Sequence, residues 1–147
     1  QACETEAIHN AGILMKNGAD CVKMEGDLYA AEKAAAVVKA GIPVMGHIGL
    51  TPQTAASFGG FKVQGKSIES AKKMIENAIA FEEAGVFAIV LECLPSALGT
   101  LIDEKLSIPT IGVGAGSLCV IFADERGRRR RCCCICPKDV VWCCRCA

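Results

Sequence analysis

The first 116 residues alternate between two patterns of apolar positions. Apolar residues recur at helical spacing in four segments, at 4–17, 28–40, 68–84 and 96–106. Short apolar runs lie between or after these segments, at 21–24, 43–48, 86–91 and 108–113. The run at 86–91 is continuous, which is typical of a strand buried on both faces. The alternation predicts an α/β chain with four parallel strands joined by helices.

Two architectures satisfy this alternation, an open doubly wound sheet and part of a (β/α)8 TIM barrel. Polar or glycine-rich residues stand at or just after the end of each predicted strand: Glu25, His47, Glu92 and the run from Gly112 to Gly116. Barrel enzymes build their sites at the carboxyl ends of several strands, whereas open sheets use one crossover point. We therefore expect a fragment of a barrel, since four units are half of one.

Composition divides the chain after Gly116. Residues 1–116 carry nine Lys/Arg, thirteen Asp/Glu and three cysteines. Residues 117–147 carry seven Lys/Arg, three Asp/Glu and eight cysteines. A hydrophobic content of 52% excludes a disordered protein, and a net charge of zero gives no field that would attract nucleic acid. No apolar stretch reaches the roughly 18 residues that a membrane helix needs. We expect neither a nucleic-acid nor a membrane partner.

Glu25 ends the strand-like run in VKMEGD. Its carboxylate suits a hard cation such as Mg²⁺, although a solvated loop acid has the same pattern. Lys23 lies two residues earlier and therefore on the same side of the strand, which inside a barrel is the interior. The two side chains indicate either an anionic ligand with its metal or a simple ion pair.

Glu92 follows six apolar residues, so we expect it to be desolvated. Burial raises the pKa of a carboxyl group and makes it a better general base near neutral pH. The alternative is a cap for the helix that begins near Ser96. His47, in GHIGLTPQ, is either part of a site or a hydrogen-bonded core histidine. The glycines at 112–116 lack a phosphate-loop signature and more simply allow close backbone approach.

Several stretches together resemble the ketopantoate hydroxymethyltransferase family, also called 3-methyl-2-oxobutanoate hydroxymethyltransferase. They are VKMEG at 22–26, GIPVMGHIGLTPQ at 41–53, FGGFKVQGKS at 58–67, EEAGVFAIVLECLP at 82–95 and IPTIGVGAG at 108–116. Their order and spacing make the resemblance specific, and it covers residues 1–116.

The resemblance implies a (β/α)8 barrel with Mg²⁺ as cofactor and 5,10-methylenetetrahydrofolate as one-carbon donor. The family transfers a hydroxymethyl group to a small-molecule substrate, 3-methyl-2-oxobutanoate, in pantothenate biosynthesis, and works as a homo-oligomer. By motif, Glu25 matches a metal ligand, Lys23 a substrate-binding residue and Glu92 the catalytic proton acceptor. His47 lies in a family motif and receives no firm role.

The chain also departs from this family at both ends. It begins in the helix before the fourth strand, so we expect the first three βα units, with two Asp ligands of Mg²⁺ and substrate, to be missing. Residues 117–147 look unrelated to the family and are interpreted as a shifted reading frame or intron read-through. Their cysteines and Arg128–Arg131 leave one functional alternative, a non-catalytic zinc- or nucleic-acid-binding protein.

A half barrel exposes strand edges and apolar faces that a whole barrel covers. We therefore expect open edges at the first and last strands, and apolar runs at 44–48 and 86–91 without half of their packing partners. This predicts a chain that folds poorly or self-associates and is inactive alone. The sequence lacks an initiator Met and a visible targeting segment. The location is expected to be mitochondrial or cytoplasmic.

Overall fold

The computed structural model describes residues 3–51, 63–116, 121–123 and 129–131. The elements in chain order are α1 (Glu4–Lys16), β1 (Val22–Glu25), α2 (Leu28–Lys39), β2 (Val44–Gly49), α3 (Ile68–Glu83), β3 (Ala88–Glu92), α4 (Ser96–Lys105), β4 (Thr110–Val113), β5 (Ile121–Ala123) and β6 (Arg129–Arg131). The four helices and four strands expected within residues 1–116 are confirmed, with ends shifted by one or two residues.

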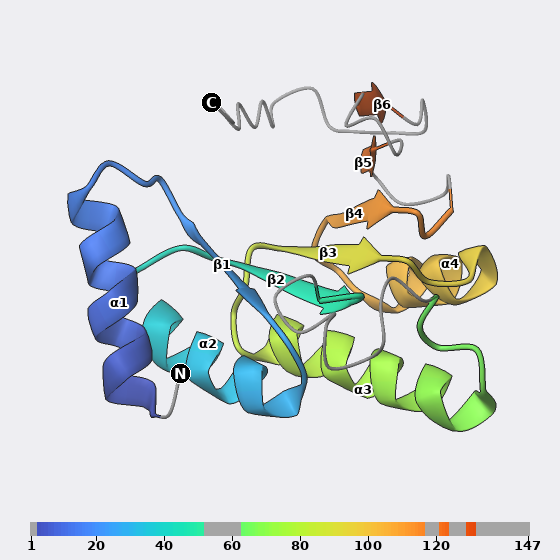
Figure 1. Cartoon of the computed structure of the whole chain (residues 1–147), viewed down its shortest axis with the longest axis horizontal. Helices are drawn as coiled ribbons and strands as arrows, with labels where there is room; N and C mark the ends of the chain where they lie inside the picture. The colour runs from blue at the N-terminus through green and yellow to red at the C-terminus, as the bar shows by residue number, and fades with distance from the viewer. Residues whose placement is uncertain (1–2, 52–62, 117–120, 124–128, 132–147) are drawn as a thin grey trace.

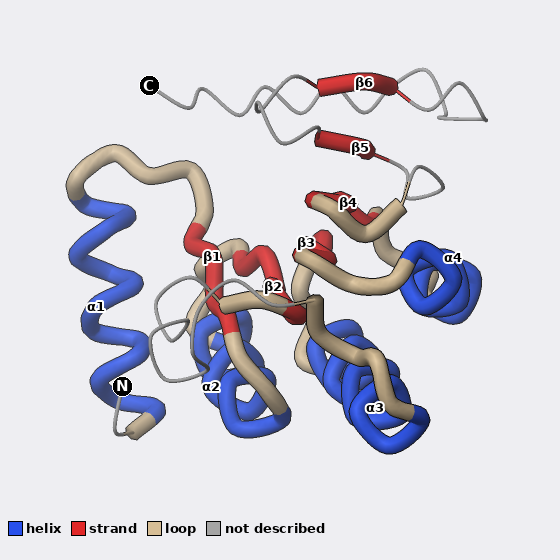
Figure 2. The backbone as a smooth tube through the Cα atoms, turned by 45° about the vertical axis from the view of Figure 1, so that its right-hand side comes forward, coloured by secondary structure: helices blue, strands red, loops and turns tan. Residues whose placement is uncertain are grey.

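One sheet contains all the described strands, in the order β1-β2-β3-β4-β5-β6. Strands β1 to β5 are parallel, and β6 runs antiparallel to β5. Figures 1 and 2 show α2, α3 and α4 along one side of this sheet, with α1 beside β1. The predicted α/β fold with a parallel sheet is confirmed.

Local sequence fixes where two of the helices begin. The Asp27 carboxylate accepts a hydrogen bond of 3.0 Å from the backbone N–H of Tyr29, which caps α2. Ser67 and Ser70 form a reciprocal capping box at the start of α3. These side chains satisfy amide groups that have no partner inside the helix, so the helices begin where the sequence analysis expected.

The hydrophobic core lies between the helices and the sheet. Its fully buried side chains include Val37, Ile48, Phe81, Ile89, Leu91 and Ile102. A Cβ atom at Gly46 would lie 3.1 Å from the ring of Phe81, closer than such contacts usually are. The glycine on β2 therefore allows α3 to pack closely on the sheet.

Side chains on β1 alternate between two environments, as strand geometry requires. Val22 and Met24 are buried on the helix-covered side. Lys23 and Glu25 share the opposite face, where Lys23 is exposed and Glu25 is partly buried. Lys23 thus lies on the face that would be the interior of a complete barrel, and within the described residues its side chain is exposed.

The expected open edge at β4 is wrong. Residues 121–123 pair in parallel with β4, with Ile111 opposite Ile121, and β6 then pairs with β5. The outermost strands of the described sheet are β1 and β6. The apolar runs expected to lack packing partners are largely buried, including Val44, Val86 and Leu91, because the helices cover the sheet. None of the described helices is long and apolar enough to cross a membrane.

Candidate functional site

Four predicted site residues come together on the face of the sheet opposite the helices. Glu25 at the end of β1 lies opposite His47 on β2, and Gly49 of β2 lies opposite Glu92 at the end of β3. Since parallel strands end at the same edge, the register brings these residues together. Lys23 precedes Glu25 by two residues on the same face. We call Lys23, Glu25, His47 and Glu92 the strand-end site.

The imidazole of His47 lies between two carboxyl groups. Its Nδ1 is 3.6 Å from Oε2 of Glu25, and its Nε2 is 3.2 Å from Oε2 of Glu92. The His47 side chain is fully buried, whereas the side chains of Glu25 and Glu92 are 12% and 19% exposed. Neither ring nitrogen has a well-directed hydrogen bond within the described residues. The two ring nitrogens of His47 therefore face the two carboxyl groups.

Burial and charge perturb two of these groups. Burial lowers the pKa of His47 to about 4, Lys23 lowers it further, and the Leu50 backbone opposes the shift. Burial raises the pKa of Glu92, and the charge of Glu25 adds to this effect while Lys23 opposes it. At neutral pH the imidazole is neutral, so the two carboxyl groups lie beside a polar ring rather than a cation.

The backbone fixes the position of Glu92. Its carbonyl oxygen accepts a hydrogen bond of 2.9 Å from the Leu50 N–H. A Cβ atom at Gly49 would lie 2.1 Å from that same oxygen, and Gly49 has a φ of +98°. A glycine is therefore required where β2 passes β3. The N-cap of α4 is Pro95 and makes no side-chain capping bond, so a capping role for Glu92 is not supported.

The glycines after β4 have a packing role. Gly116 has a φ of +101°, and a Cβ atom there would lie 2.8 Å from the Cβ of Ser96 at the start of α4. This close approach agrees with the simpler interpretation of the glycine run, in which small residues let two segments meet.

Glu25 offers one ligand of the kind that Mg²⁺ prefers, a partly exposed carboxylate at a strand end. Among the described residues, no group of three or more His, Cys, Asp or Glu is arranged to hold a metal ion. Mg²⁺ commonly uses only one or two protein carboxylates together with substrate and water oxygens. Glu25 thus fits such a site as one of its ligands. The cysteines of 132–147, on which the zinc alternative depends, lie outside the described part of the chain.

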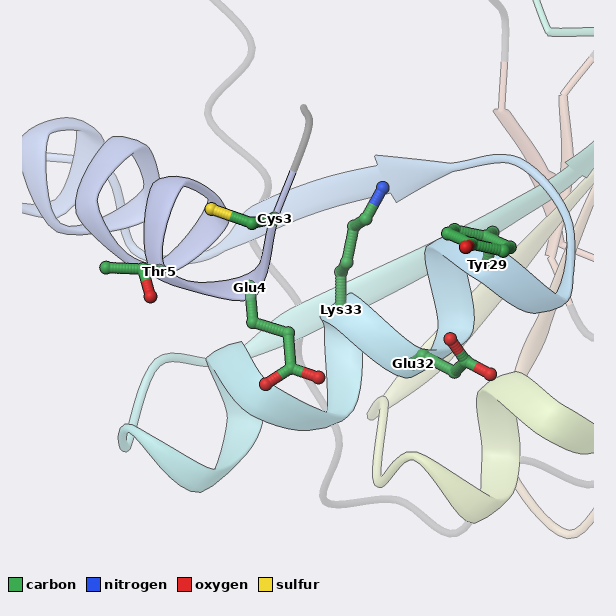
Figure 3. Close-up of a pocket in the computed structure, with 6 residues that line it drawn as sticks. All are labelled: Cys3, Glu4, Thr5, Tyr29, Glu32 and Lys33. Atoms are coloured by element: carbon green, nitrogen blue, oxygen red, sulfur yellow. The ribbon is translucent and has the colours of Figure 1, made fainter.

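A shallow hollow elsewhere was not predicted from sequence. It lies between the start of α1 and α2, and Figure 3 shows the residues that line it: Cys3, Glu4, Thr5, Tyr29, Glu32 and Lys33. The Lys33 ammonium lies 5.3 Å from the centre of the Tyr29 ring. The hollow contains no residue of the strand-end site, so the two regions are separate.

His47 has no firm role that its sequence context alone predicts. The imidazole lies between two carboxyl groups because of the register in which β1, β2 and β3 pair. That register is a property of the folded sheet and not of any one segment. The only sequence signal was its place near the end of an apolar run, a signal that it shares with many core residues.

The family profile described as ketopantoate hydroxymethyltransferase matches residues 1–120. Among curated proteins, the chain is 60% identical over 115 residues to a 3-methyl-2-oxobutanoate hydroxymethyltransferase of Clostridium botulinum, covering 78% of this chain and 42% of that protein. An Enterococcus faecalis protein of the same name is 56% identical over 127 residues, covering 83% of this chain and 46% of that protein. A third protein of this name, from Carboxydothermus hydrogenoformans, is 54% identical over 132 residues, covering 86% of this chain and 48% of that protein. The chain thus spans about half the length of these relatives.

Two solved structures share the fold. One is a dihydrodipicolinate synthase, with a TM-score of 0.54, 14% identity and coverage of 76% of this chain and 40% of that chain. The other is a prophage protein of the dihydrodipicolinic acid synthase family from Escherichia coli K12, solved with pyruvate, with a TM-score of 0.51, 17% identity and coverage of 77% and 39%. At these identities the likeness concerns the fold alone.

The mitochondrial expectation for location is wrong. The relatives named above are bacterial enzymes, and bacteria have no mitochondria.

Proposed function

Since this chain belongs to the ketopantoate hydroxymethyltransferase family, we propose that it is the part of such an enzyme that carries the catalytic base. The reaction would transfer a one-carbon unit from 5,10-methylenetetrahydrofolate to 3-methyl-2-oxobutanoate, with water supplying the hydroxyl oxygen of 2-dehydropantoate. The observation that supports this most is the meeting of Glu25, His47 and Glu92 at neighbouring strand ends.

Glu92 would accept the C3 proton of the keto acid. Its raised pKa brings it closer to neutral pH, where a general base works best. Loss of that proton leaves an enolate, which would attack the methylene carbon of the folate to form the new C–C bond. The C–N bond to the folate would then break, tetrahydrofolate would leave with the electron pair and a proton on its nitrogen, and water would supply the hydroxyl group. Lys23, whose charge already acts on Glu92 and His47, would offset negative charge on the substrate.

Glu25 would be a ligand of Mg²⁺. A bound Mg²⁺ supplies Lewis-acid chemistry, which stabilises negative charge on the keto and carboxylate oxygens of the substrate. The remaining protein ligands would come from βα units that this chain does not include. In this assignment β1 to β4 correspond to strands 4 to 7 of a (β/α)8 barrel, and the Cys- and Arg-rich segment after residue 120, where the family match ends, would lie outside the hydroxymethyltransferase domain.

The test uses a grafted enzyme, the Clostridium botulinum relative in which the aligned 115 residues are replaced by those of this chain. The readout is exchange of the C3 proton of 3-methyl-2-oxobutanoate with deuterium, followed by NMR. Glu92→Gln keeps the shape of the side chain but removes the base. We expect it to abolish exchange and leave Mg²⁺ affinity, measured by calorimetry, nearly unchanged.

The control is Glu76→Gln, which makes the same chemical change on the exposed side of α3. It should exchange the proton at the rate of the unmodified graft. Unchanged exchange in Glu92→Gln would remove Glu92 from the mechanism, and a graft without exchange would contradict the proposed function.

By itself, the 147-residue chain should be inactive and should self-associate, because β1 has a strand partner only on its β2 side among the described residues. Light scattering coupled to gel filtration measures its mass. A monomer with a sharp cooperative unfolding transition would contradict this expectation. The complete enzyme is proposed to be a homo-oligomer.

A further inference from the structure

His47 is the most enclosed polar group of the strand-end site. Its side chain is fully buried, and its two ring nitrogens have no well-directed hydrogen bond within the described residues. A buried polar group without a hydrogen-bond partner destabilises the folded protein. The same ring lies between the carboxyl groups of Glu25 and Glu92, so its two nitrogens face two different partners.

We propose that His47 is a positioning residue, which holds the Glu92 carboxyl group through Nε2 so that its free oxygen faces the reacting carbon. This inference rests on the proposed function, because it assigns His47 to the residue that would move the proton. It gives His47 no direct contact with the substrate.

His47 and Glu92 differ in how firmly the sheet holds them. His47 lies inside β2, and its neighbours in the sheet are Glu25 on one side and Val90 on the other. Glu92 is the last residue of β3 and precedes Cys93, which has a φ of +52°. His47 is therefore flanked by a paired strand on each side, whereas Glu92 lies at the end of its strand. The better supported imidazole can orient the carboxyl group more effectively than the carboxyl group can orient the imidazole.

His47 also lies closer to Glu92 than to Glu25. Nε2 of His47 is 3.2 Å from Oε2 of Glu92, within hydrogen-bond range although not well directed. Catalytic hydrogen bonds are often poorly aligned before substrate binds and tighten in the complex. A small rotation of the Glu92 side chain would align this one. Nδ1 is farther from Glu25, at 3.6 Å, so the contact with Glu92 is the closer of the two.

The two nitrogens can be tested separately in the grafted enzyme. The amide nitrogen of glutamine lies close to the position of Nε2, and that of asparagine close to the position of Nδ1. His47→Gln can therefore still reach Glu92, whereas His47→Asn can reach only the side of Glu25. His9→Gln, on the exposed surface of α1, is the control.

We expect His47→Asn to lower kcat for C3-proton exchange by about 100-fold, the cost of a misplaced catalytic group, with little change in KM. His47→Gln should retain most of the activity. Equal losses in the two variants, or a greater loss in His47→Gln, would overturn the proposal. So would a loss that appears in KM alone.

A second readout does not depend on activity. In a graft with isotope-labelled glutamate, the carboxyl resonance of Glu92 reports its contact with the ring. The resonance should move in His47→Asn and stay near its original position in His47→Gln. Equal movement in both variants would overturn the proposal. If the unmodified graft does not exchange the C3 proton, the proposed function is contradicted. The Glu92 carboxyl resonance then still tests whether His47 holds Glu92.

Discussion

The strand-end site and the hollow between α1 and α2 both bring acidic and basic side chains together, but in very different surroundings. His47 is fully buried between Glu25 and Glu92. In the hollow, by contrast, Tyr29 is 70% exposed, and Glu4 and Glu32 are also exposed. Exposed charges interact through water, which weakens their mutual effect, whereas a buried group loses its hydration. Enclosure rather than residue type therefore separates a candidate site from an ordinary surface.

The largest expected effect comes from disrupting the backbone that encloses the site. Gly49→Ala would force a Cβ atom against the Glu92 carbonyl oxygen at a backbone angle that favours glycine. We expect a loss of roughly 4 kcal/mol in the free energy of unfolding of the grafted enzyme, from strain and overpacking together. Urea denaturation measures it.

The matched control is Gly12→Ala on α1, where a new Cβ atom would have no neighbour within 4 Å. It should raise stability by about 0.5–1 kcal/mol, because alanine favours the helix. A similar result in both variants would show that close approach at Gly49 is unimportant.

The next effect is a dependence of stability on pH. As pH falls from 7, His47 gains a proton in the unfolded chain around its ordinary pKa of 6.5, but in the folded protein only near 4. The unfolded chain therefore binds more protons in this window, and stability falls by up to roughly 3 kcal/mol. Glu92, with its raised pKa, acts in the opposite direction.

His47→Gln isolates the contribution of His47. Urea denaturation of the metal-free graft at pH 7 and at pH 4.5 should give a smaller difference in the variant than in the parent. His9→Gln should preserve the difference. An identical pH dependence in the parent and His47→Gln would mean that the ring is not desolvated in solution.

A smaller change in the free energy of unfolding is expected at Glu82, which is less buried than His47 and less exposed than Tyr29. The Glu82 carboxylate, at the end of α3, accepts backbone hydrogen bonds of 2.6 Å from Ser107 and 3.1 Å from Ile108, just before β4. Glu82→Ala should lower the free energy of unfolding by about 1–2 kcal/mol, because two backbone N–H groups lose a charged hydrogen-bond acceptor. Urea denaturation of the grafted enzyme measures it. Glu83→Ala, on the exposed side of the same helix, should change stability by less. Equal losses would show that the link to β4 contributes nothing.

The smallest effect belongs to the hollow. Lys33→Ala removes the ammonium that lies over Tyr29 and should cost at most about 1 kcal/mol, as exposed cation–π contacts do. Thermal unfolding of the grafted enzyme measures it, and C3-proton exchange should not change. A large loss of exchange would mean that the hollow and the strand-end site are coupled.

Much of the fold could be predicted because the relevant signals are local. The helical spacing of apolar residues located the helices to within a residue or two, and the structure shows Asp27 and Ser67 capping two of them. The strand-end positions of Glu25 and Glu92 followed from the same pattern, since parallel strands end at one edge. The pairing of residues 121–123 with β4 was missed, because a short strand within a Cys- and Arg-rich segment carries no clear periodicity.

The sequence by itself determined the family, the alternation of helices and parallel strands, and the residue types available at the strand ends. Only the tertiary structure decided that His47 lies between Glu25 and Glu92, and that Lys23 is exposed. The physical reason is that strand register and burial depend on contacts between segments far apart in the chain. Desolvation, which shifts the pKa values of His47 and Glu92, exists only once those segments have packed together.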